Sequence, residues 1–241
     1  MPDLAIDPIR HALRDGGPNY VETPADLDRF TGSIAEPWNS ASAVLFILIP
    51  IVWAWHLRGR YREHPFLVAC LPILATGGVG GVLFHGLRTT AFYRFLDVIP
   101  IYLLGCGVSI WLWIRLGPKF RHLLGMIAFL ALLQSLAFFR LPIHWAINMS
   151  YAALATLVLI PIILALLRTR FRNAGWVYAA LVFFATAWLC RLADPVRPPL
   201  LPMGTHWLWH TFGALTAASL SVYVYRIEKV PFLKAADLKG G

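Results

Sequence analysis

Long apolar segments alternate with short polar connections from residue 38 to residue 226. Seven segments carry few charged residues, and they cover 38–57, 65–86, 95–115, 122–139, 145–168, 173–193 and 205–226. Each is 18 to 24 residues long, which matches the roughly 20 residues that an α-helix needs to cross the hydrocarbon core of a bilayer. The segments are too long and too uniformly apolar for the alternating strands of a membrane barrel. The pattern therefore predicts an all-α integral membrane protein, a bundle of seven transmembrane helices.

The polar ends of the chain predict three regions. Residues 1–37 form an extramembrane N-terminal tail without the apolar core of a signal peptide, 38–226 the transmembrane domain, and 227–241 a C-terminal tail. The composition agrees, since 59% of the 241 residues are hydrophobic, 14% are charged and the mean hydropathy is +0.65. These values lie outside the range of soluble globular domains.

The formal charge of +9 indicates membrane topology and not nucleic-acid binding, because the basic residues are spread over short loops and form no continuous stripe. Cytoplasmic loops of membrane proteins carry the excess of Lys and Arg. Thirteen of the 21 basic residues follow the first, third, fifth and seventh segments: Arg58, Arg60, Arg62, Arg115, Lys119, Arg121, Arg168, Arg170, Arg172, Arg226, Lys229, Lys234 and Lys239. We therefore expect a multi-pass protein with the N-terminus outside and the C-terminus in the cytoplasm.

Four polar residues converge at the non-cytoplasmic face in this topology. His85 ends the second segment, Asp97 begins the third, Asp194 follows the sixth and His206 begins the seventh. Ionisable groups at membrane depth are costly and are normally retained for a function or a partner. This face is therefore where we expect the functional site.

The histidines in this group have the spacing of metal ligands. His206 and His210 are four residues apart, which places both imidazoles on one side of a helix about 6 Å from each other. Catalytic zinc takes three protein ligands and leaves a fourth position for water, and His85 supplies the third. Bound zinc lowers the pKa of water towards about 7, and Asp97 is the candidate to accept the proton. The alternative is that the HxxxH pair serves helix packing, and His144 is a possible substitute ligand.

Four motifs appear in an order that resembles a known family. They are AEPWNSAS at 35–42, the glycine-rich GGVGGVLFHG at 77–86, LDxxP at 96–100 and GTHWLWH at 204–210. Together they resemble the alkaline ceramidases and the wider CREST superfamily of seven-helix membrane hydrolases, which includes the adiponectin-type receptors.

The resemblance implies that His85, His206 and His210 bind zinc and that Asp97 assists the water. The sequence differs from the family pattern in two features of the site. Gly81 occupies the position, four residues before the first histidine, where the family places a serine, and the spacing from His85 to Asp97 is one residue longer than usual. A missing hydroxyl donor can be worth roughly 3 kcal/mol in enzymes that depend on one.

The resemblance also implies a calcium site near the N-terminus. Asn19, Tyr20 and Glu22 match the family's D-W-C-E element, and Glu36 matches its later glutamate. Carboxylate and amide oxygens suit Ca²⁺, although Asn19 replaces an aspartate and Pro24 stands where another ligand is expected. The alternative is a solvated acidic tail with a helix cap near Glu36.

The expected function is that of a zinc-dependent intramembrane hydrolase that cleaves the amide bond of a ceramide-like lipid, giving a fatty acid and a long-chain amine. Its active site faces the non-cytoplasmic side. The alternative, favoured by Gly81, is a lipid-binding or signalling protein that keeps the zinc site with little turnover. A small-molecule transporter is a weaker third possibility, because paired broken helices and repeat symmetry are not apparent.

Overall fold

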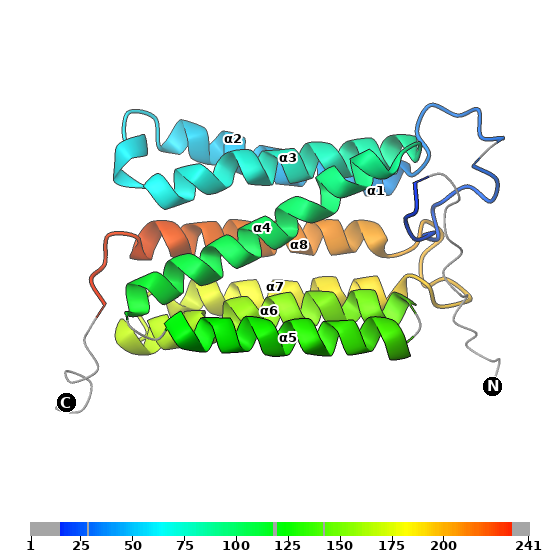
Figure 1. Cartoon of the computed structure of the whole chain (residues 1–241). Coiled ribbons are helices and arrows are strands. Elements are labelled where there is room, and N and C mark those ends of the chain that lie inside the picture. The colour runs from blue at the N-terminus through cyan, green and yellow to red at the C-terminus, as the bar shows by residue number, and fades with distance from the viewer. Residues whose placement is uncertain (1–14, 28, 118–119, 142, 233–241) are drawn as a thin grey trace. The chain divides into compact units, whose positions relative to one another are not determined.

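The computed structural model of the chain describes residues 15–27, 29–117, 120–141 and 143–232. The described residues form eight α-helices and one short 3₁₀ helix, and they contain no β-strand (Figure 1). The elements are α1 (Pro37–Ala43), α2 (Leu45–His56), η1 (Tyr61–Glu63), α3 (Pro65–Leu87), α4 (Ala91–Leu116), α5 (Phe120–Arg140), α6 (Ile143–Arg168), α7 (Ala174–Ala193) and α8 (His206–Ile227). The predicted all-α class is confirmed for this part of the chain.

Six helical stretches within the described residues are long and apolar enough to cross a membrane. They are Pro37–His56, which joins α1 and α2, then Pro65–Leu87, Ala91–Leu116, His122–Arg140, Trp145–Arg168 and Ala174–Ala193. The seventh predicted span is helical as α8 but is not among the six, because histidine, threonine and serine residues recur along it. A multi-pass membrane protein is thus supported, while the seventh crossing and the orientation stay predictions.

Part of the orientation argument rests on residues outside the described part. These are Lys119, Lys234 and Lys239. The tails at 1–14 and 233–241 lie outside it as well, and so do the side chains of Arg121 and His144.

The first predicted span divides into α1 and α2 at Val44. The Val44 N–H donates to the Ala41 carbonyl at 3.2 Å, three residues back instead of four. Just before this point the Ser42 hydroxyl donates to the carbonyl of Asn39 at 2.9 Å. A side chain that bonds to the backbone competes with regular helical hydrogen bonding, so the helix tightens where the chain passes the site described below.

Helix α4 begins earlier than the apolar pattern predicts. The segment was expected to start at residue 95, but the helix begins at Ala91, after Thr90, whose hydroxyl accepts from the Phe92 N–H at 3.3 Å. A threonine just before the first turn satisfies a backbone donor that has no partner within the helix. Asp97 therefore lies in the second turn of α4 instead of at its start.

The chain forms two compact units. The first contains residues up to Ile101 and Gly175–Tyr225, and the second contains Tyr102–Ala174 and the residues from Arg226 onward. In the second unit, α5 and α6 lie side by side (Figure 1). Its buried core is apolar and consists of Trp113, Leu116, Leu123 and Leu157. All of the candidate site residues with described side chains belong to the first unit.

Glycines in α3 allow close helix packing in the first unit. A Cβ atom on Gly80 would lie 2.2 Å from the carbonyl carbon of Leu96 in α4, and one on Gly78 would lie 2.9 Å from the backbone nitrogen of Ile47 in α2. Such distances leave room for hydrogen alone, so the backbones of α2 and α4 approach α3 directly. The glycine-rich motif therefore brings α4 against the end of α3 that carries His85.

The segment before α1 packs onto the end of α3. The Ala35 N–H donates to the Gly86 carbonyl at 2.8 Å, and the Glu36 N–H donates to the His85 carbonyl at 3.0 Å. The carboxylates of Asp15 and Glu36 are fully buried. The alternative of a solvated acidic tail is therefore wrong for these two residues.

Candidate metal centre

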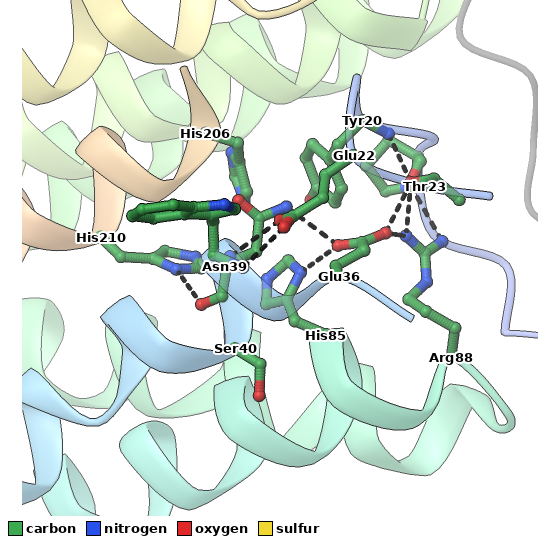
Figure 2. A network of polar contacts seen from close by, with 12 residues as sticks. Tyr20, Glu22, Thr23, Glu36, Asn39, Ser40, His85, Arg88, His206 and His210 are labelled. Atoms are coloured by element: carbon green, nitrogen blue, oxygen red, sulfur yellow. Dashed lines mark hydrogen bonds and ion pairs between the residues drawn. The ribbon is translucent and has the colours of Figure 1, made fainter. Parts of the chain in front are cut away.

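Three buried imidazoles meet at one end of the first unit. His85 comes from the last turns of α3, and His206 and His210 come from the first turns of α8 (Figure 2). One nitrogen from each residue lies within 4.8 Å of the other two. Two nitrogens on one tetrahedral zinc ion are about 3.4 Å apart, so small side-chain rotations bring all three to a common ion. We call these residues the histidine cluster, and their predicted convergence is confirmed.

Hydrogen bonds fix the tautomers of two of these imidazoles. His85 Nδ1 lies 2.5 Å from Oε2 of Glu36, and His210 Nδ1 lies 3.0 Å from the backbone oxygen of Asn39 and 3.0 Å from Oγ of Ser42. A carboxylate and a carbonyl only accept, so the proton of each neutral ring sits on Nδ1. The Nε2 lone pairs of His85 and His210 are then available to a metal, in the carboxylate–histidine arrangement of many metal sites.

Two nitrogens of the cluster have no hydrogen-bond partner in the described part of the chain. They are Nε2 of His85 and Nδ1 of His206, and both are buried. Buried polar atoms are nearly always paired, so two orphans in one cluster call for an explanation. A bound cation that accepts imidazole lone pairs would satisfy them, and the donor set suits zinc.

Tyr20 covers one side of the histidine cluster. Its ring stacks on His206 with centroids 3.8 Å apart and an interplanar angle of 18°, and it lies 5.3 Å from the ring of His85. Burial raises the pKa of Tyr20, while the charges of Arg191 and Arg88 only partly offset that rise. The phenol therefore stays neutral at physiological pH and keeps its proton as a hydrogen-bond donor.

Asp194 holds the first turn of α8. Its Oδ1 accepts from the N–H groups of Thr205 at 2.7 Å and His206 at 3.0 Å, and its Oδ2 accepts from the Val21 N–H at 3.2 Å. Gly204, with φ +73°, brings the chain to this carboxylate, and a Cβ there would lie 2.5 Å from Oδ1. The second carboxylate predicted at this face thus positions His206 instead of contacting the metal position.

Asp97 lies beside the histidine cluster but does not belong to it. Its carboxylate interacts electrostatically with His85. A Cβ added to Gly81, one helical turn before His85, would lie 3.0 Å from Asp97 Oδ1 and 3.0 Å from the Ala43 Cβ. The absent side chain at Gly81 therefore leaves the space in which the Asp97 carboxylate rests. This placement suits a proton acceptor next to the metal position better than a ligand.

The residues expected to bind calcium have other partners. Both Glu22 oxygens accept backbone N–H groups at the start of α1, from Trp38 at 2.6 Å and Asn39 at 2.9 Å. Of the Glu36 oxygens, one bonds to His85 and the other to Arg88 and Thr23. Tyr20 packs on the histidine cluster, and the buried side-chain oxygen of Asn19 has no hydrogen-bond partner in the described part of the chain. These contacts do not fit a calcium site.

The environment of Glu36 explains its charge. Burial would raise the pKa of this carboxyl, but the hydrogen bond with His85 and the charge of Arg88 outweigh burial and lower the pKa below its usual value. Glu36 is therefore ionised at all physiological pH values. Its Oε2 accepts the Nδ1 proton of His85, which leaves Nε2 of that ring available to a metal.

Sequence reasoning did not identify several residues that support the cluster. Asn39 and Ser42 lie within the AEPWNSAS motif but were assigned no role, and Arg88 and Arg191 were counted only as loop charges. Arg191 interacts electrostatically with Asp97 and His210, and its guanidinium lies 5.4 Å from the ring of Trp209. A signal was present for Arg88, because it follows His85 by three residues and so ends the same helix.

Comparison with known proteins gives no independent assignment. No protein-family model matches the chain, and no curated protein matches its sequence.

Proposed function

We propose that the chain is a zinc-dependent intramembrane hydrolase that cleaves the amide bond of a ceramide-like lipid to a fatty acid and a long-chain amine. The observation that carries the proposal is the histidine cluster, in which three buried imidazoles offer ligand atoms within 4.8 Å of one another. The ordered motifs that resemble the alkaline ceramidases supply the substrate class.

Each group at the site has a role in this reaction. A zinc ion held by His85, His206 and His210 supplies a Lewis acid and an acidified water at neutral pH. Asp97 takes the proton of the attacking water and returns it to the departing amine nitrogen, so that the hydroxyl ends on the acyl carbon as the C–N bond breaks. The Tyr20 hydroxyl is the candidate donor to the carbonyl oxygen, since Gly81 provides no hydroxyl at the position where the family places a serine.

The membrane-spanning helices suit a lipid substrate. The histidine cluster lies at the ends of α3 and α8, where water and the edge of the hydrocarbon core meet if these helices cross the bilayer. A lipid then enters from the membrane while water arrives from the aqueous side. We propose that this side is the non-cytoplasmic one, as the distribution of basic residues predicts.

Metal analysis combined with lipid mass spectrometry tests the proposal. The purified protein should hold one zinc per chain and convert ceramide-like amides to free fatty acid and amine. His210→Ala should lose both properties, whereas His56→Ala, an exposed histidine at the far end of α2, should retain both. Protein without stoichiometric zinc, or unchanged turnover in His210→Ala, would refute the proposal.

The second candidate is a lipid-binding or signalling protein that holds zinc without efficient turnover. The observation in its favour is Gly81, which lacks the hydroxyl of the family serine. The position of Asp97 next to Gly81 favours the hydrolase instead. A Cβ added at position 81 would lie 3.0 Å from Asp97 Oδ1, so a side chain there would compete with the carboxylate for space. The two candidates differ in what a side chain added at position 81 does to turnover.

A further inference from the structure

Arg88 occupies an unusual backbone position at the end of α3. It caps the helix with φ 50° and ψ 38°, in the left-handed region, and only 2% of its surface is exposed. Glycine or asparagine is the usual residue at such a cap because other side chains are strained there. A buried arginine in this conformation indicates that the contacts of its side chain outweigh the backbone strain.

The guanidinium of Arg88 makes five hydrogen bonds, which matches its five N–H groups. Nε donates to Asp15 Oδ2 at 2.6 Å, and Nη2 donates to Asp15 Oδ1 at 3.2 Å and to the Pro18 carbonyl at 3.0 Å. Nη1 donates to Glu36 Oε1 and to the Thr23 hydroxyl, the latter at 3.3 Å. We call Arg88 and these four acceptor residues the arginine cluster.

The acceptors are the oxygen set that a hard cation would use. Two carboxylates, a backbone carbonyl and a hydroxyl surround one positive charge, and the carboxylates of Asp15 and Glu36 are both fully buried. Such a set would suit Ca²⁺ if the centre were vacant. Here the centre holds a covalently attached cation.

We propose that Arg88 serves as a built-in cation that replaces calcium in fastening the segment 15–36 to the end of α3, so that this protein needs no calcium ion. Asp15 and Pro18 tie the beginning of the segment to α3, Thr23 ties its middle and Glu36 ties its end. The same segment carries Tyr20, which stacks on His206.

Arg88 also positions a member of the histidine cluster through Glu36. One oxygen of Glu36 accepts from Arg88 and the other lies 2.5 Å from His85 Nδ1. The guanidinium thereby fixes the carboxylate that orients the imidazole, which makes Arg88 a positioning residue. This second part rests on the proposed metal site, whereas the replacement of calcium does not.

The first experiment uses the unaltered full-length protein in detergent. Its Tm is measured after EGTA treatment and again with millimolar Ca²⁺, and its retained calcium is determined by elemental analysis. We expect no retained calcium and the same Tm in both conditions, because a ligand that binds the folded state would raise Tm. Retained stoichiometric calcium, or a Tm that rises with Ca²⁺, would overturn the inference, whatever the result for zinc or turnover.

The second experiment removes the built-in cation. Arg88→Ala should lower Tm by about 10 °C, since it leaves buried carboxylates unpaired. Added guanidinium or Ca²⁺ should restore much of that loss by filling the vacated centre. Arg94→Ala is the matched control, because Arg94 donates to the carbonyl of Gly16 in the same segment but contacts neither carboxylate of the cluster. An equal loss in Arg94→Ala, or no loss in Arg88→Ala, would contradict the proposal.

Arg88→Lys covers the case in which Arg88→Ala does not fold. Lysine keeps the charge but has three donors in place of five, so we expect a smaller fall in Tm and a zinc affinity lowered several-fold, with partial rescue by guanidinium. A purely structural role would lower Tm without changing the zinc affinity of the folded protein. That result would refute the positioning role and leave the replacement of calcium standing on the first experiment.

Discussion

The histidine cluster and the arginine cluster are neighbours at the end of α3, and Glu36 belongs to the contacts of both. In the arginine cluster every guanidinium N–H has an acceptor. In the histidine cluster two buried nitrogens, on His85 and His206, have no partner in the described part of the chain. The arginine cluster is therefore fully hydrogen-bonded within the protein, whereas the histidine cluster has two nitrogens that would need a partner from outside the described chain.

The difference has a chemical cause. Carboxylates can be neutralised by an arginine from the same chain, whereas three neutral imidazole lone pairs that point to one place need a Lewis acid. The chain supplies its own cation where the role is to fasten a segment. In the histidine cluster, Nε2 of His85 and Nδ1 of His206 have no partner in the described part of the chain, as the proposed metal site requires. Changes at the shared and flanking residues should separate these two roles.

The largest effect is expected from Glu36→Gln, which disturbs both clusters at once. The amide keeps the size of the side chain but loses the charge that pairs with Arg88 and orients His85. We expect a loss of about 3 kcal/mol in the free energy of unfolding and a zinc affinity lower by about 10- to 100-fold. Thermal melts and chelator competition measure the two quantities.

Glu22→Gln is the matched control for this change, because its oxygens accept backbone N–H groups of Trp38 and Asn39 and not a guanidinium or an imidazole. It should alter zinc affinity little. If Glu36→Gln lowers stability while zinc affinity stays the same, Glu36 serves the arginine cluster alone and the link between the clusters is wrong.

Gly81→Ala is a change next to the histidine cluster that leaves the arginine cluster unaltered. The added Cβ would lie 3.0 Å from Asp97 Oδ1, so the carboxylate must shift by a few tenths of an ångström. A displacement of about 1 Å near the reacting atoms can cost about 100-fold in kcat, so this smaller shift should lower kcat by up to about tenfold. Zinc content should not change. Gly107→Ala in α4 is the control, since a Cβ there meets nothing within 4 Å. A gain of turnover in Gly81→Ser would instead mark the site as degenerate and favour the binding protein.

The histidine cluster was predictable from the sequence because its signals are local. The HxxxH spacing fixes the relation of His206 to His210, and the length of the apolar segments places His85 at the same end of the fold. The hydrophobic segments also predicted, to within a few residues, the six helical stretches that are long and apolar enough to cross a membrane. The start of α4 was placed too late because Thr90, a capping residue, begins the helix before the apolar run.

The arginine cluster was not predictable in the same way. Asp15 and Arg88 are 73 residues apart in the sequence, and Glu36 lies between them. No spacing rule connects a polar tail to a loop arginine. The pairing depends on how the segment before α1 folds back on α3. The resemblance to a calcium-binding family suggested a cation at this place but could not indicate that the chain provides one itself.

A smaller effect is expected at the start of α8, on the other side of the histidine cluster. In Asp194→Asn the three backbone N–H groups lose a charged acceptor. A hydrogen bond to a charged acceptor stabilises the fold more than one to a neutral acceptor, so we expect the free energy of unfolding to fall by about 2 kcal/mol. Hydrogen exchange should accelerate at Thr205 and His206 while Arg88 contacts persist. Equal acceleration throughout the segment 15–36 would show that Asp194 holds the whole N-terminal segment instead of the helix start.

The smallest effect is expected from Ser42→Ala, which removes one of the two contacts of His210 Nδ1. The Asn39 carbonyl still accepts the Nδ1 proton at 3.0 Å, so the tautomer of His210 is preserved. We therefore expect the free energy of zinc binding to weaken by about 1 kcal/mol, which is a roughly fivefold lower zinc affinity. Ser221→Ala is the control, because its hydroxyl bonds only within α8, to the Ala217 carbonyl. Chelator competition on both variants measures the difference. A loss in Ser42→Ala as large as that in Glu36→Gln would mean that the hydroxyl, and not the backbone carbonyl, sets the tautomer of His210.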